Sequence, residues 1–140
     1  MDDSLPRHLF VYGTLMTSAT GSLGRDMRLR LRREARSIGG GTLAGRLYDL
    51  GSYPGLVRSD DPTELVHGEV LELMDPAKTL PWLDEYEGVL RGPQAIGEYE
   101  RVVVEANMAT GGRLDASVYV FRRPIVGLPW VRSGRWKPRN

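Results

Sequence analysis

The first candidate for a chemically active group is the carboxyl group of Glu87. Glu87 follows Leu80 and Leu83 with helical spacing, so a helix through this segment turns all three toward one apolar face. Burial, the negative end of the helix dipole and like charge from Asp84 and Glu85 would each raise the pKa of this carboxyl group. A carboxyl group with a pKa near neutrality suits proton shuttling. A glutamate at a frayed helix end whose side chain reaches water fits the same spacing, so both interpretations stay open.

The segment Tyr12-Gly13-Thr14-Leu15 is the second candidate. It follows an apolar run that indicates a strand, and a strand that ends in a sharp glycine turn leaves backbone amides pointing outward. Such a concave group of N–H donors binds carboxylates or oxyanions. A plain loop explains the same residues, because glycine turns commonly follow strands. Neither Gly-x-Gly-x-x-Gly nor Gly-Lys-Ser/Thr follows, which argues against a phosphate site.

Metal ligands and nucleophiles are sparse in this chain. There is no cysteine, and the only histidines, His8 and His67, stand far apart without a paired helical spacing. A zinc site would need carboxylates gathered from several elements, and no Gly-x-Ser-x-Gly sequence marks a serine nucleophile. We therefore expect no metal, and we interpret His67 as a strand residue beside a bulge glycine.

Composition points to one small globular domain that spans residues 1–140. Hydrophobic residues make up 41% of the 140 residues and charged residues 26%, which is a common globular mixture. The net charge of +1 gives no broad positive field to attract nucleic acid or anionic membranes. The acidic N-terminus and the short run Leu9-Phe10-Val11 resemble neither a signal peptide nor a membrane span. We expect a cytoplasmic monomer or homodimer with no nucleic-acid or membrane partner.

The arginines are unevenly placed along the chain. Six of them fall between Arg25 and Arg36, accompanied only by Asp26 and Glu34 as acidic residues. An apolar stripe with a spacing of four residues, consisting of Met27, Leu31 and Ala35, runs through the same segment. The pattern fits a solvated amphipathic helix face, and it also fits a basic docking face for an acidic partner.

Periodicity and turn signals place the elements that must hold the candidate residues. Apolar or alternating runs predict strands at His8–Tyr12, Thr42–Leu50, Leu56–Val57, Leu65–Leu73, Tyr99–Asn107 and Leu114–Phe121. The last two are joined by Thr110-Gly111-Gly112 and form a hairpin. The tail from Arg122 to Asn140 is expected to wrap the surface without regular structure.

Glycine and proline set the expected limits of two helices. The first runs from Arg25 to about Arg36, and Gly39-Gly40-Gly41 ends it and forms a turn. A second helix can start at Asp75-Pro76, but Pro81 cannot donate to a helix already under way. The segment can therefore be a short turn followed by a second helix from about Pro81 to Tyr86. Because strands and helices do not alternate strictly, the sequence predicts an α+β fold whose mixed, mostly antiparallel sheet can curl into a barrel with flanking helices.

Several of these signals occur in an order that resembles the γ-glutamylcyclotransferase-like superfamily, including its AIG2-like (avirulence-induced-protein-like) and γ-glutamylamine cyclotransferase branch. The motifs that carry the resemblance are Phe10-Val11-Tyr12-Gly13-Thr14-Leu15, Gly45-x-Leu47-Tyr48, Tyr53-Pro54-Gly55, Val66-x-Gly68-Glu69-Val70, Leu83-Asp84-x-Tyr86-Glu87-Gly88 and Tyr99-x-Arg101. The resemblance implies a mixed β-barrel with a cavity at one end, where the Tyr12 to Leu15 loop meets Glu87.

The same resemblance implies an activity and roles for residues. Tyr12 and the amides of Gly13, Thr14 and Leu15 would hold the glutamyl part of a small γ-glutamyl substrate. Glu87 would be the general acid/base that turns this substrate into 5-oxoproline and free amine, without metal or organic cofactor.

Two tyrosines and the departures from the family pattern leave alternatives open. Tyr53 and Tyr119 are expected either to line the cavity or to be ordinary packed aromatics. Many relatives place a basic residue soon after the loop, whereas Met16 to Thr20 is neutral here, so the group attached to the glutamyl unit stays open. The alternative function is a non-catalytic module that retains the cavity and binds a small molecule.

Overall fold

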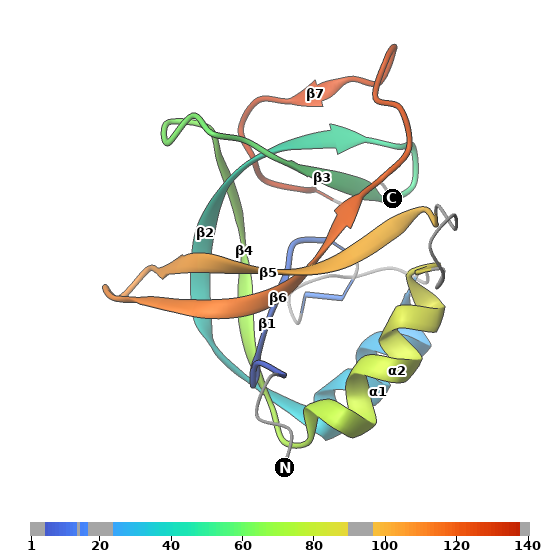
Figure 1. Cartoon of the computed structure of the whole chain (residues 1–140), viewed down its shortest axis with the longest axis vertical. Helices are drawn as coiled ribbons and strands as arrows, with labels where there is room; N and C mark the ends of the chain where they lie inside the picture. The colour runs from blue at the N-terminus through green and yellow to red at the C-terminus, as the bar shows by residue number, and fades with distance from the viewer. Residues whose placement is uncertain (1–4, 14, 17–23, 90–96, 138–140) are drawn as a thin grey trace.

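The computed structural model describes residues 5–13, 15–16, 24–89 and 97–137, and its centre is a closed β-barrel (Figure 1). The barrel strands are β1 (His8–Val11), β2 (Ala35–Asp49), β4 (Leu65–Leu73), β5 (Tyr99–Met108) and β6 (Arg113–Phe121). They follow the order β2-β4-β1-β6-β5, and a further pairing of β2 with β5 closes the ring. β1 is parallel to β6, while the other neighbouring pairs are antiparallel. The expected α+β class, with a mixed and mostly antiparallel barrel, is confirmed.

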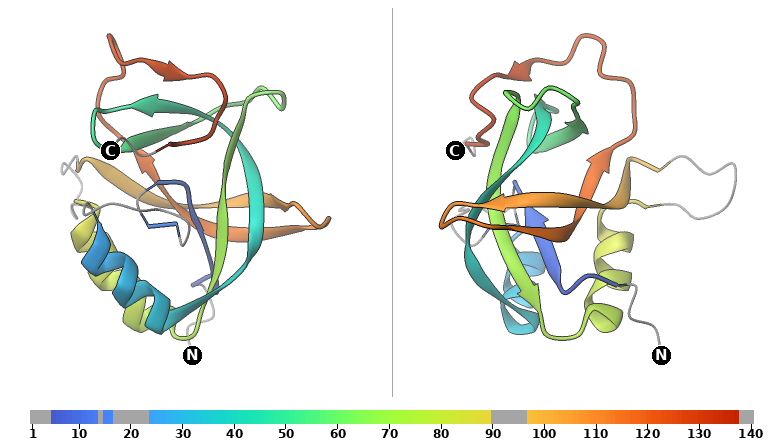
Figure 2. Two further views of the ribbon diagram at one scale, coloured as in Figure 1. Left: turned by 180° about the vertical axis from the view of Figure 1, so that it is seen from behind. Right: turned by 60° about the vertical axis from the view of Figure 1, so that its left-hand side comes forward.

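Two helices flank the barrel. α1 (Arg25–Glu34) and α2 (Pro76–Tyr86) lie side by side along it, which is clearest from behind (Figure 2). Glu34, the last residue of α1, accepts hydrogen bonds from Thr79 Oγ1 at 2.6 Å and from Trp82 Nε1 at 3.0 Å, both in α2. This carboxylate therefore ties the two helices together. Within the described residues, no helix is long and apolar enough to cross a membrane.

Strand β1 is buried on both faces, as its continuous apolar sequence predicts. Phe10 belongs to a cluster that takes residues from all five barrel strands and fills the barrel. Leu9 and Val11 point the other way and pack with Leu31 of α1 and Leu83 of α2. One short strand thus joins the barrel interior to the layer beneath the helices, and it ends at the candidate loop.

The expected turn at Gly39-Gly40-Gly41 is wrong, because these glycines lie inside β2. Helix α1 ends at Glu34, short of Arg36, and the chain passes directly into a strand of 15 residues that pairs with β4 along its first part. The register shifts between Ser37 and Gly39, and Gly39 has a φ of 123°, which side chains rarely adopt. Gly39 therefore serves a bulge in this strand, and Gly40 and Gly41 continue its pairing with β4. Cross-strand pairing outweighs their local preference for a turn.

The alternative with a break at Pro81 is wrong, and the helix start at Asp75-Pro76 is confirmed. α2 is a single helix that contains Pro81, although the proline lacks the N–H that a helix interior uses. Leu80 and Leu83 on either side of it are almost completely inaccessible to solvent. Packing of this face against the barrel, together with the bonds to Glu34, holds the helix through the proline. Gly88, with a φ of 72°, follows the helix end as expected.

The chain beyond β6 is mostly irregular, but it is more integrated than the sequence predicts. β3 (Pro54–Arg58) and the two-residue strand β7 (Trp130–Val131) both pair with the far half of β2. Trp136 is 7% exposed and belongs to the barrel cluster. The expectation that the tail only wraps the surface is therefore wrong for these residues. Apolar burial of a large indole explains the difference.

Candidate active site

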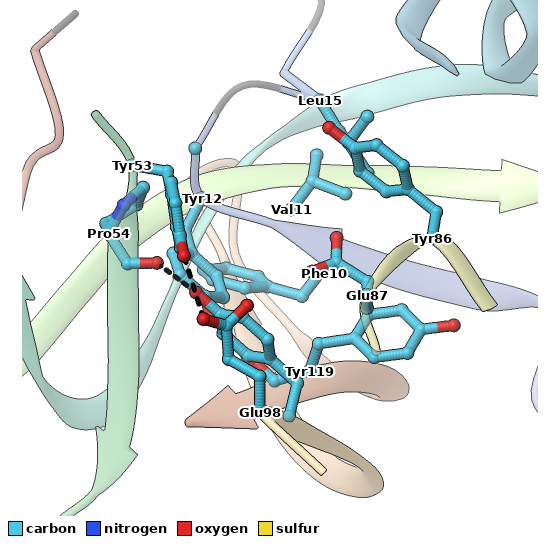
Figure 3. A pocket seen from close by; sticks show the side chains of 12 residues that line it. Phe10, Val11, Tyr12, Leu15, Tyr53, Pro54, Tyr86, Glu87, Glu98 and Tyr119 are labelled. Carbon is cyan, nitrogen blue, oxygen red and sulfur yellow. Dashed lines mark hydrogen bonds between the residues drawn. The ribbon is translucent and has the colours of Figure 1, made fainter. Parts of the chain in front are cut away.

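A cavity of about 230 Å³ lies where the end of β1, the start of β3 and the end of α2 meet (Figure 3). Its lining residues are Phe10, Val11, Tyr12, Gly13, Leu15, Tyr53, Pro54, Tyr86, Glu87, Glu98, Tyr99 and Tyr119. All of the site residues expected from the sequence line this one cavity, except Thr14, which lies outside the described residues. The size suits a small molecule rather than a macromolecule.

Glu87 reaches the cavity from the end of α2. It directly follows the last helical residue, Tyr86, and its backbone N–H donates to the carbonyl of Leu83 at 2.8 Å. Its side chain is partly buried, and burial, helped by the charge of Glu98, raises its pKa to about 7. A carboxyl group with this pKa can accept and return a proton near neutral pH.

The like charge that acts on Glu87 comes from Glu98, and the expectation that Asp84 and Glu85 supply it is wrong. Asp84 is 3% exposed and forms an ion pair with Arg101, whose Nε donates to Oδ1 at 2.9 Å. Glu85 is exposed to solvent. The nearer charges in sequence are therefore neutralised or screened, while Glu98 faces the same cavity from the start of β5.

The buried Asp84 also positions Tyr119. The hydroxyl of Tyr119 donates to Asp84 Oδ1 at 2.7 Å, so the same carboxylate binds β6 through Tyr119 and β5 through Arg101. Burial, followed by this hydrogen bond, raises the pKa of Tyr119 well above its ordinary value. The end of α2, which carries Glu87, is thus fastened to two strands of the barrel.

Two further tyrosines form the frame of the cavity. Tyr12 donates from its hydroxyl to the carbonyl of Tyr119 at 2.6 Å and accepts a bond from the N–H of Leu56 at 3.3 Å. Tyr99 donates to the carbonyl of Pro54 at 2.6 Å. Burial raises the pKa of both phenols well above the ordinary value. These hydroxyls therefore link the strands around the cavity and stay protonated.

The candidate loop leaves β1 at Tyr12 and folds back at once. The N–H of Met16 donates to the carbonyl of Gly13 at 3.1 Å, which closes a tight turn. A Cβ atom at position 13 would stand 2.9 Å from two ring carbons of Pro54, so only glycine fits without movement. Leu15 is buried against the second apolar cluster. The glycine is thus required because the loop and β3 approach closely at the cavity edge.

Glu98 is the main site residue that the sequence analysis missed. Its carboxylate accepts a hydrogen bond from the hydroxyl of Tyr53 at 2.8 Å, and this bond, followed by burial, raises the pKa of Tyr53 to about 12. Glu98 comes directly before Tyr99, where the expected strand Tyr99–Asn107 begins. The tyrosine-rich surroundings of Glu98 give no periodic signal, since Tyr53 and Glu98 are 45 residues apart.

Within the described residues, no group of three or more histidine, cysteine, aspartate or glutamate side chains could hold a metal ion. His67 lies in β4 beside Gly68 and outside the cavity. Burial and the charge of Arg135 lower its pKa. The polar side chains among the described lining residues are carboxylates and phenols.

Comparison with known sequences gives consistent results. Residues 9–138 match the family described as "Gamma-glutamyl cyclotransferase, AIG2-like". The γ-glutamylcyclotransferase family protein ytfP of Citrobacter rodentium is 34% identical over 132 residues, which cover 94% of this chain and 96% of that protein. YtfP of Escherichia coli K12 is 38% identical over 95 residues, covering 68% of this chain and 70% of the relative.

Solved structures share the same architecture. The solution structure of ytfP from Escherichia coli matches with a TM-score of 0.61 and 33% identity, covering 92% of this chain and 95% of that one. The crystal structure of an AIG2-like protein from Mus musculus matches with a TM-score of 0.66, covering 95% and 96% of the two chains. Its identity of 23% is evidence for the fold alone.

Proposed function

The chain belongs to the γ-glutamyl cyclotransferase, AIG2-like family, and from this premise we propose that it cyclises a γ-glutamyl amine or peptide to 5-oxoproline and releases the free amine. The observation that carries the proposal is Glu87, a partly buried carboxyl group in the cavity with a pKa of about 7. At neutral pH such a group is divided between its two protonation states, so it can serve as both base and acid.

The substrate supplies its own nucleophile in this reaction. The α-amine of the glutamyl unit attacks the γ-carbonyl carbon, a five-membered lactam closes, and the bond between that carbon and the leaving amine breaks. The α-nitrogen loses two protons in all and the leaving nitrogen gains two, so the reaction needs a group that carries protons between them. Glu87 would take each proton from the α-nitrogen and deliver it to the leaving amine, a contribution of about 10² to 10⁴ in rate.

The loop at Tyr12, Gly13, Thr14 and Leu15 would hold the other end of the glutamyl unit. Its amides are proposed to bind the α-carboxylate or the developing oxyanion, while Tyr53 and Tyr119 wall the cavity around the bent substrate. Holding the cyclising conformer is worth several kcal/mol, up to about 7–11 in the best intramolecular cases. The rigid frame of hydrogen-bonded tyrosines supports this role, because it fixes the cavity shape before the substrate enters.

Replacement of Glu87 by glutamine tests the proposal. Glu87→Gln keeps the shape of the side chain and removes the proton acceptor, and Glu85→Gln on the exposed side of α2 is the matched control. Release of 5-oxoproline is measured with γ-glutamyl amines, γ-glutamyl amino acids and ε-(γ-glutamyl)lysine. We expect Glu87→Gln to release 5-oxoproline from the active substrate about 10²-fold more slowly than wild type, or slower still, and the control to keep the wild-type rate. A Glu87→Gln rate near wild type would show that the assigned role is wrong.

The same assay separates the enzyme from a non-catalytic binding module, since a module would bind these compounds without consuming them. We further propose that the protein acts in the cytoplasm as one domain, as a monomer or homodimer, and that it needs no cofactor, because the α-amine is an internal nucleophile.

A further inference from the structure

The cavity contains a second acidic residue beside the proposed acid/base. Glu98 lines it together with Glu87, and its charge helps to raise the pKa of Glu87. Among the described lining residues, none is lysine or arginine. Arg101, which lies close behind the wall, is bound to Asp84 through both Nε and Nη2, at 2.9 and 3.3 Å. A second carboxylate in this position works against ionisation of Glu87 unless a positive charge enters.

Tyr53 holds the carboxylate of Glu98 in place. The hydroxyl of Tyr53 donates to Oε2 of Glu98 at 2.8 Å, which fixes the carboxylate against the wall (Figure 3). One hydrogen bond leaves the other lone pairs of the carboxylate available to a ligand. The pair combines a fixed anion with an aromatic ring, and this combination recognises an ammonium group.

Glu87 shows the complementary feature. Within the described part of the chain, no side chain or backbone N–H donates a hydrogen bond to its carboxyl group, which lines the cavity and is partly buried. A partly exposed carboxyl group in this position can accept a hydrogen bond from a ligand that enters the cavity. The carboxyl end of α2 lies at the same point, and the helix dipole there favours a cation.

We propose that Glu98, positioned by Tyr53, forms with Glu87 a subsite for a positively charged ammonium group of the substrate. The inference rests on the proposed function for the identity of the substrate, since a γ-glutamyl amide carries one ammonium on its α-carbon. A second ammonium is present when the leaving group is a diamine. Either ammonium group would bring a positive charge to the two carboxylates. Glu98 would therefore help to determine which substrates bind.

Three probes distinguish the sources of the charge. The γ-glutamyl amide of n-butylamine has only the α-ammonium, the γ-glutamyl amide of 1,4-diaminobutane has a second ammonium at its far end, and glutaryl n-butylamide has none. Binding is measured by calorimetry with Glu87→Gln, in which the proposed turnover is blocked and Glu98 is the remaining carboxylate of the subsite, and with the double variant that adds Glu98→Gln. A double variant with Glu100→Gln, an exposed residue of β5 paired with Arg122, is the matched control.

We expect Glu98→Gln to weaken binding of ammonium probes by about tenfold to a hundredfold, and the control to leave it unchanged. Equal weakening of both γ-glutamyl probes, with glutaryl n-butylamide unaffected, identifies the α-ammonium. Weakening of the diamine probe alone identifies the second ammonium. The subsite does not exist if Glu98→Gln changes the affinity for all three probes by the same factor. It also does not exist if no ammonium probe binds better than glutaryl n-butylamide.

Turnover by the wild-type protein is scored separately. Ammonium-dependent binding without 5-oxoproline release would leave the subsite standing and overturn the proposed function. Release of 5-oxoproline, combined with a uniform effect of Glu98→Gln on the probes, would overturn the subsite alone.

Discussion

Glu87→Gln should make the protein more stable than wild type above pH 7, although it removes the proposed catalytic group. The pKa of Glu87 rises from an ordinary value of 4.5 to about 7 in the folded protein. At 1.36 kcal/mol per pKa unit, this difference corresponds to about 3 kcal/mol of folding free energy. Because the side chain is only partly buried, solvent screening reduces the expected gain to about 1–3 kcal/mol.

The sign of this stability difference follows from the fact that Glu87 holds its proton more tightly in the folded chain than in the unfolded chain. Below pH 4.5, Glu87 is protonated in both the folded and the unfolded chain, and wild type and Glu87→Gln respond to pH alike. Between pH 4.5 and about 7 the unfolded chain releases its proton first, so wild-type stability falls relative to the variant. Above about pH 7 the difference is complete and stays constant.

Urea unfolding at a series of pH values measures this difference. The free energy of unfolding of wild type is subtracted from that of Glu87→Gln at each pH, which cancels the other titrating groups, and Glu85→Gln serves as the control. The reasoning would be refuted if the difference stayed flat from pH 4 to pH 8, or if the variant lost stability at high pH. Either result would mean that the carboxyl group of Glu87 is solvated in the folded protein.

Three further changes follow from the same contacts. In Glu98→Gln, the acidic limb of the pH profile of kcat/KM should move from about pH 7 toward lower pH, because one of the two causes that raise the pKa of Glu87 is gone; an unmoved limb would contradict this. Gly13→Ala should lower stability by about 1–3 kcal/mol in thermal unfolding and reduce kcat/KM, since its Cβ would meet Pro54 at 2.9 Å. Glu34→Ala should cost about 1–3 kcal/mol in urea unfolding, because the α2 hydroxyl and indole that bind this carboxylate lose their acceptor, whereas an unchanged midpoint would show that they re-pair.

Local periodicity and turn residues predicted the parts of the fold that a short sequence pattern specifies. The strand Leu65–Leu73 has the predicted bounds, and the hairpin of β5 and β6 follows from its glycine turn. Residues 39–41 and Pro81 were interpreted from local preference alone, and there the structure differs. In both places, strand pairing or helix packing with distant residues contributes more than the local cost.

The candidate site divides in the same way. Helical spacing from Leu83 allowed Glu87 to face inward or to reach water, and only the family resemblance implied that it lines the cavity. Glu98 has no such spacing, because Tyr53 and Glu87 belong to other parts of the chain and share the cavity with it only in the folded structure. The sequence shows that Glu98 is acidic, but it does not show which carboxylate lies near it. That neighbour depends on how β5, β6 and the helices pack together.

The phenols of the cavity explain why proton transfer would depend on a carboxyl group. The hydroxyls of Tyr12 and Tyr99 donate to backbone carbonyls, and that of Tyr119 donates to the buried Asp84. Each phenol has a raised pKa, so giving up its proton would leave a buried anion and break a bond between strands. The tyrosines therefore keep the cavity in shape and remain neutral. Glu87, with a pKa of about 7, is therefore the group that we propose to carry protons, and the charge of its neighbour Glu98 would favour the approach of a cation.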